Sequence, residues 1–276
     1  MEKIQREIII RPEQPWWEID SRELWSYREL FYVFVWRDII VRYKQTVVGI
    51  AWVVFQPLVT TGIFSVFFGK IAKIPSDNLP YPLFVLIGMV IWGFFSSGVS
   101  SGSQSLITNE GILKKVYFPR LIIPLSAILT SGFDFLISLV LVLFALIFYG
   151  YFPGLSFIFW MPVFILILML TISGLAMFTS ALNVKYRDVR YVLPFFIQIG
   201  LFLSPIIYPL SVIYDYRKYF LIINPLTGVV EGVRAVISNQ PVNLEVLFIG
   251  LSVSIVVFLF GLFYFRETER FFADIA

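Results

Sequence analysis

Long apolar stretches separated by short polar segments dominate this 276-residue chain, and they constrain its fold more than any other feature. A helix of about 20 residues crosses the ~30 Å hydrocarbon core of a bilayer, and each stretch approaches or exceeds that length. With 59% hydrophobic and 14% charged residues, the chain has more apolar surface than a water-soluble core can bury. We therefore predict an all-α integral membrane protein with six transmembrane helices. They are expected near residues 50–68, 82–101, 121–148, 155–182, 192–210 and 247–265.

The distribution of basic residues predicts the orientation of these helices. Lysine and arginine resist translocation, so cytoplasmic loops contain most of them. In the six-span arrangement, sixteen of the 21 basic residues fall on one side of the membrane, which is the side of both termini. We therefore expect both termini to be cytoplasmic. The net charge of +3 then reflects membrane topology, and no nucleic-acid partner is expected.

The segment before the first predicted span, residues 1–48, is expected to be cytoplasmic. Its first 20 residues alternate charges with prolines and tryptophans, so they lack the continuous apolar core of a cleavable signal peptide. Residues 22–44 place most of their polar side chains near one helical face, which predicts an amphipathic helix lying in the membrane interface. Such a helix can anchor on lipid headgroups, dock a partner protein, or do both. The transmembrane domain then covers residues 49–266, followed by a cytoplasmic tail at residues 267–276.

Two cytoplasmic loops contain charged residues with more than one interpretation. The loop 103–120 includes a short amphipathic segment that ends before a proline, which predicts a short helix. Its Lys114 and Lys115 either mark the cytoplasmic side or contact a partner. The same two interpretations apply to Arg187 and Asp188, between the fourth and fifth spans.

The outer connection 211–244, between the fifth and sixth spans, is unusually apolar for a solvated loop. Because neither half is long enough to cross the bilayer, we predict two short re-entrant helices that dip into the outer leaflet. Asn224 and Pro225 provide an N-cap and a first helical residue for the second one. Glu231 and Arg234 lie three residues apart, so they share a helical face. Re-entrant backbone is tolerated at that depth only against protein or a wet cavity.

Aromatic residues make up 18% of the chain and occur inside the spans as well as at their ends. Those in spans one, two and five either line a route on which sugar rings can stack, or pack against lipid and neighbouring helices. The channel-lining candidates are Trp52, Phe55, Phe64, Trp92, Phe95, Phe195, Phe196, Phe202 and Tyr208.

Asp134 is the most conspicuous charge within a predicted span, and a carboxylate at that depth normally faces protein or water. We predict an interhelical hydrogen bond or a protonated acid there. The alternative is an ion site in a proton-coupled or facilitated secondary transporter. The chain contains no histidine and no cysteine, so the commonest acid–base group and two usual metal ligands are missing. We therefore expect no catalytic residue, metal or cofactor in this chain, which argues against a membrane-embedded transferase.

Several motifs, in order along the chain, resemble the permease subunit of ABC-type polysaccharide and polyol-phosphate exporters. They are RYKQTVVG at 42–49, KKVYFPR at 114–120, NVKYRDVR at 183–190, SPIIY at 204–208 and NPLTG at 224–228. The resemblance covers most of the chain and is strongest to the O-antigen and teichoic-acid exporter branch.

This resemblance implies a homodimer in the bacterial cytoplasmic (inner) membrane, bound to two copies of a cytoplasmic ABC ATPase subunit and exporting a lipid-linked polysaccharide. The chain has no Gly-x-x-x-x-Gly-Lys-Ser/Thr phosphate loop, so ATP and Mg are expected in the partner, and this chain is not expected to be an enzyme. The resemblance also assigns ATPase coupling to the N-terminal helix and the first cytoplasmic loop, and an outer gate to the re-entrant region. The coupling candidates are Glu29, Arg37, Arg42, Lys44, Asn109, Glu110, Lys114, Lys115, Tyr117, Arg187 and Asp188. The outer-gate candidates are Asn224, Pro225, Glu231 and Arg234.

Overall fold

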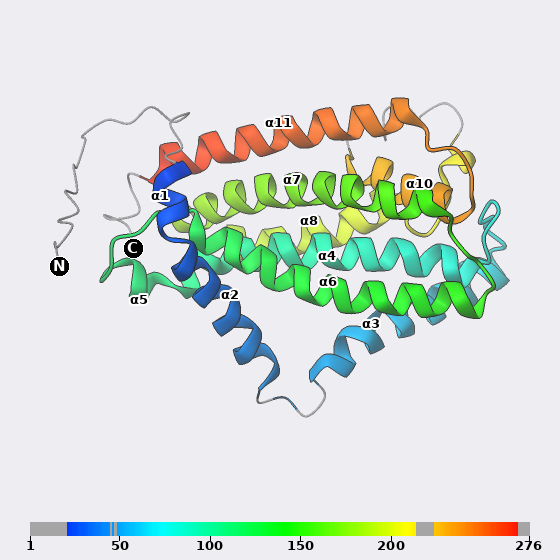
Figure 1. Ribbon diagram of the computed structural model, residues 1–276, viewed down its shortest axis with the longest axis horizontal. Helices are drawn as coiled ribbons and strands as arrows, with labels where there is room; N and C mark the ends of the chain where they lie inside the picture. The colour runs from blue at the N-terminus through cyan, green and yellow to red at the C-terminus, as the bar shows by residue number, and fades with distance from the viewer. Residues whose placement is uncertain (1–20, 45, 47–48, 214–223, 270–276) are drawn as a thin grey trace.

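The computed structural model describes residues 21–44, 46, 49–213 and 224–269, and within these ranges the chain is helical, with no strand. Figure 1 shows the long helices running side by side along the longest axis of the molecule. This arrangement confirms the predicted all-α class. The elements are α1 (Ser21–Ser26), α2 (Arg28–Tyr43), α3 (Gly49–Phe64), the π-helix η1 (Ser65–Ile71), α4 (Tyr81–Thr108), α5 (Glu110–Leu113), α6 (Ile122–Phe148), α7 (Leu155–Lys185), α8 (Val189–Leu203), the 3-10 helix η2 (Leu210–Val212), α10 (Leu226–Ile237) and α11 (Leu244–Glu269).

Five helices in the described part of the chain are long and apolar enough to cross a membrane. They are α3 continued by η1, then α4, α6, α7 and α11. Their positions confirm five of the predicted spans, the first four and the last. The chain is therefore a multi-pass membrane protein.

The predicted fifth span, residues 192–210, is shorter in the structure than its hydropathy suggested. Helix α8 has 15 residues, which corresponds to about 22 Å and is less than the hydrocarbon thickness. It ends at Leu203, and the backbone of the next residue, Ser204, is extended. Pro205 follows directly, and the residue before a proline is disfavoured in helix. The six-span count is therefore not confirmed. The apolar stretch continues to residue 210, but the helix breaks before Pro205.

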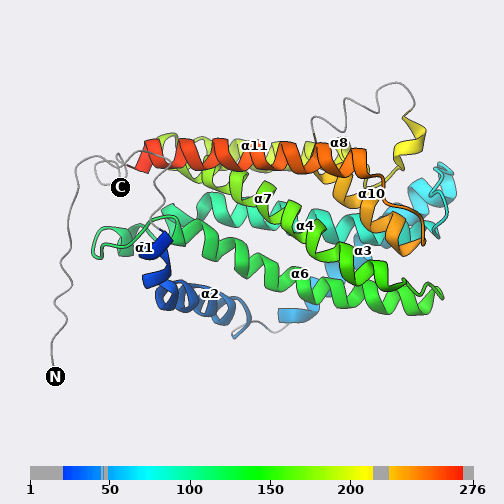
Figure 2. The same cartoon turned by 45° about the horizontal axis from the view of Figure 1, so that its top comes forward.

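The predicted N-terminal helix, residues 22–44, is present as two helices separated by a turn at Tyr27. The longer one, α2, packs against α6, and its Phe34 is buried. Figure 1 shows α2 running obliquely to α6, and Figure 2 shows α2 beside the first part of α6. Of the two predicted outer helices, α10 is one, and the other would fall in residues 214–223, outside the described residues.

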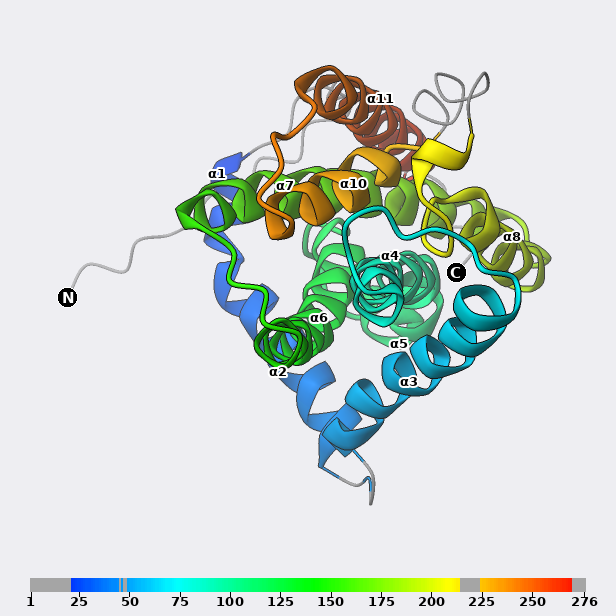
Figure 3. The same ribbon diagram turned by 90° about the vertical axis from the view of Figure 1, so that its right-hand side faces the viewer.

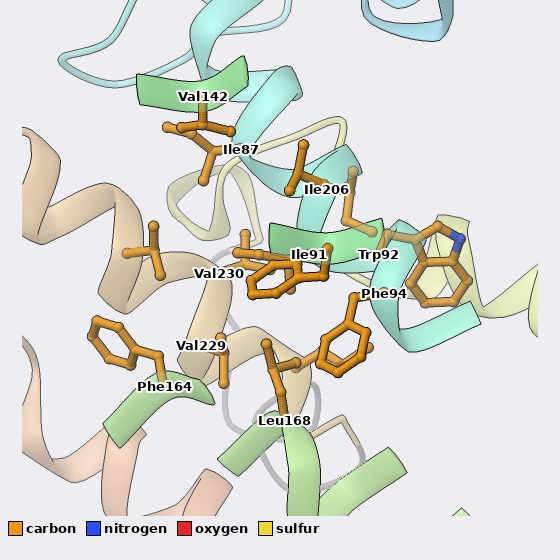
Figure 4. Packing of buried hydrophobic residues seen from close by; sticks show 14 of the residues in the cluster. Ile87, Ile91, Trp92, Phe94, Val142, Phe164, Leu168, Ile206, Val229 and Val230 are labelled. Carbon is orange, nitrogen blue, oxygen red and sulfur yellow. The ribbon is translucent and has the colours of Figure 1, made fainter. Parts of the chain in front are cut away.

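Helix α4 forms the centre of the bundle. Figure 3, which looks along the helices, shows α4 surrounded by α3, α6, α7 and α8. It contributes more residues to the main core than any other helix, and the ring of Phe94 stacks on Phe135 of α6 at 4.8 Å between centroids. The core residues labelled in Figure 4 include Ile87, Ile91, Trp92 and Phe94 from α4, Phe164 and Leu168 from α7, and Val229 and Val230 from α10.

Helices α7 and α11 pack closely along a line of small residues. A methyl group added to Gly261 would overlap the backbone carbonyl of Gly174. One turn away, the hydroxyls of Thr171 and Ser254 lie 2.8 Å apart in a buried hydrogen bond. Small residues allow membrane helices to approach until their backbones touch, which replaces the hydrophobic driving force that lipid cannot supply.

Candidate functional site

A groove of about 810 Å³ lies between α3, α4 and α6, with the end of α2 at its edge; we call it the central groove. One part of its lining is polar and includes Gln56, Ser97 and Ser131. Another part is aromatic and includes Trp52 and Trp92. The groove can therefore both hydrogen-bond and stack on a bound molecule.

Most of the groove hydroxyls are already bonded within the protein. Ser97 donates to Ser131 at 3.1 Å, Ser96 donates to the carbonyl of Gly93 at 3.2 Å, and Thr60 donates to that of Gln56 at 2.8 Å. Their hydrogen-bonding capacity is thus satisfied without a ligand. A polar molecule in the groove could hydrogen-bond to these hydroxyls only by replacing the bonds that they make within the protein.

The structure places two of the nine channel-lining candidates, Trp52 and Trp92, in this groove. Phe55, on α3, is exposed but does not line it. The remaining aromatics are arranged as follows: Phe195, Phe196 and Phe202 are exposed on α8, Phe64 packs on Phe68, Phe95 packs on Trp92, and the hydroxyl of Tyr208 donates to the carbonyl of Phe202. Sequence reasoning missed the groove residues Gln56, Thr60, Ser96, Ser97 and Ser131, although their polar type inside apolar spans was a usable signal.

Asp134 lies near the middle of α6, at the edge of the central groove. One of its carboxylate oxygens accepts a hydrogen bond from the Arg42 guanidinium, and the other accepts one from the Tyr43 hydroxyl. The ring of Phe133 contacts that of Tyr43 edge-on at 5.9 Å. Burial, together with the hydrogen bond to Asp134, raises the pKa of Tyr43, which keeps its phenol protonated. The structure thus shows the interhelical hydrogen bond predicted for Asp134. It also places Arg42, one of the ATPase-coupling candidates, at the central groove.

The middle of α2 is fixed to the loop 103–120 by polar and aromatic contacts. Arg37 donates to the side-chain oxygen of Asn109 at 2.9 Å and also pairs with Asp38 at 2.7 Å. The ring of Phe34 lies against that of Phe118 at 5.7 Å and under the Arg37 guanidinium at 4.8 Å. These contacts belong to a second, smaller core at one end of the bundle, which also includes residues of α4, α6, α7 and α11. Two coupling candidates, Arg37 and Asn109, are therefore in direct contact.

Charged side chains gather at that same end, where Figure 1 shows α1, α5 and the start of α2 together. Lys114 pairs with Glu110 at 2.6 Å across α5. Lys114, with a smaller contribution from Arg187, lowers the pKa of the Glu110 carboxyl. The coupling candidates at this end are named the docking face: Glu29, Glu110, Lys114, Lys115, Tyr117, Arg187 and Asp188. All of them are exposed except Glu110, which is half-buried. Lys44 is also exposed, but it follows the opposite end of α2.

Arg234 of α10 is buried at the opposite end of the bundle and binds backbone carbonyls from three directions. Its guanidinium donates to Pro205 at 2.6 Å, to Ile206 at 2.9 Å and to Phe84 at 3.0 Å, and it lies 3.4 Å from the centre of the Phe84 ring. Glu231 pairs with it at 3.2 Å. Burial lowers the pKa of Arg234 to about 10, so the group stays charged at neutral pH. The arginine thus satisfies the backbone where α8 has ended.

Asn224 and Pro225 lie beside this cluster. The Asn224 amide donates to the hydroxyl of Ser204 at 2.6 Å, and its oxygen accepts from the backbone N–H of Leu226 at 3.0 Å. The predicted cap is therefore present, although α10 begins at Leu226 after the buried Pro225. The four outer-gate candidates are thus gathered around the backbone break that follows α8. Within the described residues, no group of three or more acidic residues could hold a metal ion.

Comparison with known proteins agrees with this architecture. The ABC-2 type transporter family matches residues 29–238. The O-antigen export system permease protein RfbA of Klebsiella pneumoniae is 28% identical over 247 residues, covering 90% of this chain and 95% of that protein. RfbA of Myxococcus xanthus is 28% identical over 257 residues, covering 92% and 97%. The polysialic acid transport protein KpsM of Escherichia coli is 24% identical over 236 residues, covering 85% and 91%.

Proposed function

Because the chain belongs to the ABC-2 type transporter family, we propose that it is the membrane permease of an ATP-driven exporter of a lipid-linked polysaccharide. Its relatives include permeases of O-antigen export and a polysialic acid transport protein, each matched over most of its length. The lipid-linked form of the substrate and the bacterial cytoplasmic (inner) membrane, with both termini in the cytoplasm, are part of this proposal. The secondary-transporter alternative has less support, because Asp134 is paired with Arg42.

The central groove is the observation that carries the proposal. Its aromatic rings can stack on sugar faces, and its hydroxyls can exchange their internal partners for those of a sugar. Neither contact depends on one fixed polymer sequence. A long glycan that must keep sliding needs weak, repeated contacts of this kind, whereas a tight polar pocket would stall it.

The proposed assembly is a homodimer in which each subunit has six spans. Helix α8 would cross as the fifth span together with the residues after its break, where Arg234 satisfies the carbonyls. Only Thr61 is buried in α3, and no residue is buried in α8. These two apolar helices are therefore free to form the interface with a second copy, and their separation would widen the groove into a channel.

The docking face would bind the ATPase subunits, which hold ATP and Mg. Because the Arg37–Asn109 and Phe34–Phe118 contacts join α2 to the loop 103–120, both segments would move together when the ATPase closes. The pair Lys114–Glu110 would keep α5 folded while it is pushed.

The test is reconstitution with a candidate ABC ATPase partner, in lipid vesicles containing a lipid-linked glycan. We expect a complex of two copies of each subunit whose ATP hydrolysis rises with glycan, and glycan transfer that stops when the phosphate-loop lysine of the ATPase is replaced by alanine. Transfer driven by a proton gradient without ATP would contradict the proposal and return attention to Asp134.

A further inference from the structure

Helix α2 is attached at two places by different kinds of contact. Its middle is held by the Phe34–Phe118 ring contact and by the Arg37–Asn109 hydrogen bond, beside the docking face. Its last turn ends in the central groove, where Arg42 and Tyr43 bind Asp134. Arg37 and Arg42 are separated by about 7.5 Å along the helix axis. A short rigid element therefore connects the proposed ATPase contact with the groove wall.

The contact in the groove combines the hydrogen bonds to Asp134 with one ring contact, between Tyr43 and Phe133. We call Arg42, Tyr43 and Asp134 the Asp134 anchor. The side chains of Arg42 and Asp134 are 35% and 20% exposed, and Phe34 is the buried residue of α2. Beyond them, the Thr46 hydroxyl lies 3.3 Å from the carbonyl oxygen of Tyr43, to which it donates at the end of the helix. When the Arg42–Asp134 pair is removed, the Tyr43–Phe133 ring contact is what remains of this attachment.

We propose that Asp134 is a positioning residue for export, because it fixes the end of α2 to the groove wall so that movement of the docking face reaches the groove. The inference rests on the proposed function. The direction of dependence follows from the contacts. Loss of the anchor leaves the middle of α2 attached to the loop 103–120, but this part of α2 could then move without displacing the groove wall around Asp134. ATP would still be hydrolysed, with less glycan moved for each ATP.

A purely structural role makes a different prediction. Replacing both partners of a partly buried ion pair by apolar residues often leaves stability unchanged or increases it, whereas removing one partner leaves an unpaired charge. Asp134→Asn is therefore an ambiguous variant, since Arg42 would be left unpaired. The double variant Arg42→Leu/Asp134→Leu removes the link without that penalty. The exchanged variant Arg42→Asp/Asp134→Arg restores a pair between the same two helices.

The experiment measures export per ATP hydrolysed by the full complex in vesicles for these two variants. A matched control is Arg266→Leu/Glu269→Leu, which removes an ion pair within the single helix α11. We expect export per ATP to fall about fivefold or more in the double leucine variant, the lower range of an allosteric coupling free energy, and to be largely restored by the exchange. The α11 control should retain the wild-type ratio.

A second measurement tests the anchor without relying on transport. The chain contains no cysteine, so spin labels can be placed at two introduced cysteines, Val41→Cys on α2 and Val140→Cys on α6, both exposed. The wild type should give a narrow distance distribution that broadens in the double leucine variant. A folded double variant with a narrow distribution and wild-type export per ATP would overturn the inference. If the wild-type complex showed no ATP-dependent export, the proposed function would fail, while the spin-label distances would still test the anchor.

Discussion

Helices α3 and α4 are both apolar enough to cross a membrane, yet they have very different surroundings. In the most apolar part of α4, 67% of the residues are buried inside the protein, whereas the corresponding figure for α3, with η1, is 6%. Helix α4 is surrounded by other helices, and α3 forms an outer wall of the central groove. Hydropathy thus identifies the segments that enter the bilayer, but it does not say whether protein or lipid will be their neighbour.

Replacing a buried and an exposed arginine should give the largest difference in the free energy of unfolding. Arg234→Met keeps the length of the side chain but removes the donors to the carbonyls of Pro205 and Ile206, so we expect a loss of about 3 kcal/mol in the free energy of unfolding. Arg190→Met, on exposed α8, is the control and should change it by less than about 0.5 kcal/mol. Unfolding in mixed micelles with increasing SDS measures both. Equal effects would show that α10 is not rigidly held.

A pair of glycines tests helix contact directly. Gly261→Ala would force α11 away from α7, because the new methyl meets backbone and not a movable side chain, at an expected cost of about 2 kcal/mol. Gly62→Ala on α3 has no atom within 4 Å and should stabilise the subunit by about 0.5 kcal/mol. Unfolding in mixed micelles with increasing SDS measures the stability of both variants. If Gly62→Ala weakened only the assembled complex, it would show that another chain covers this part of α3.

The same substitution, isoleucine to alanine, at a buried and an exposed position should give a smaller difference in stability. Ile172 of α7 is fully buried, and Ile63 of α3 is 48% exposed. Ile172→Ala leaves unfilled space and should cost about 2 kcal/mol, mainly through lost packing contacts. Ile63→Ala shortens a side chain that is exposed in the single subunit and should cost less than about 0.5 kcal/mol. A similar cost at both positions would mean that α3 is packed as tightly as α7.

The smallest expected effect on stability concerns the docking face. Lys114→Gln removes the exposed partner of Glu110, so the unfolding transition should not move measurably, while stimulation of the ATPase by glycan should fall. Lys114 lowers the pKa of Glu110, so their attraction is complete above the ordinary glutamate pKa and is lost as pH falls through the lowered value. Unchanged stimulation in Lys114→Gln would remove this residue from the coupling surface. Lys70→Gln, exposed on η1, is the control.

The sequence was sufficient to predict the elements whose physics is local. Five spans, the short helix after Asn109, and the cap at Asn224 follow from runs of apolar residues, from the proline that closes the loop 103–120, and from the capping preference of asparagine. The predicted end of the fifth span, residue 210, was wrong, because α8 ends at Leu203. A window of hydropathy averages over Ser204 and Pro205, so it does not register the break.

The pairings between distant residues could not be predicted in the same way. Asp134 was expected to bind another helix, but its partners Arg42 and Tyr43 lie about ninety residues away, and helix rotation decides which side chains meet. Arg37 and Asn109 were grouped by resemblance, without any indication that they touch. For the same reason, Trp52 and Trp92 could not be separated from the aromatics that face outward.

The central groove also has a consequence for how the subunit is made. Its serines, Gln56 and the Asp134 anchor lie along a groove that is open in the single chain, and a bilayer supplies no water to such groups. A newly inserted copy would expose this polar surface to lipid until α3 and α8 are covered. We therefore expect its lifetime in the cell to depend on how quickly it finds its assembly partners, which makes balanced synthesis of the subunits part of the protein's quality control.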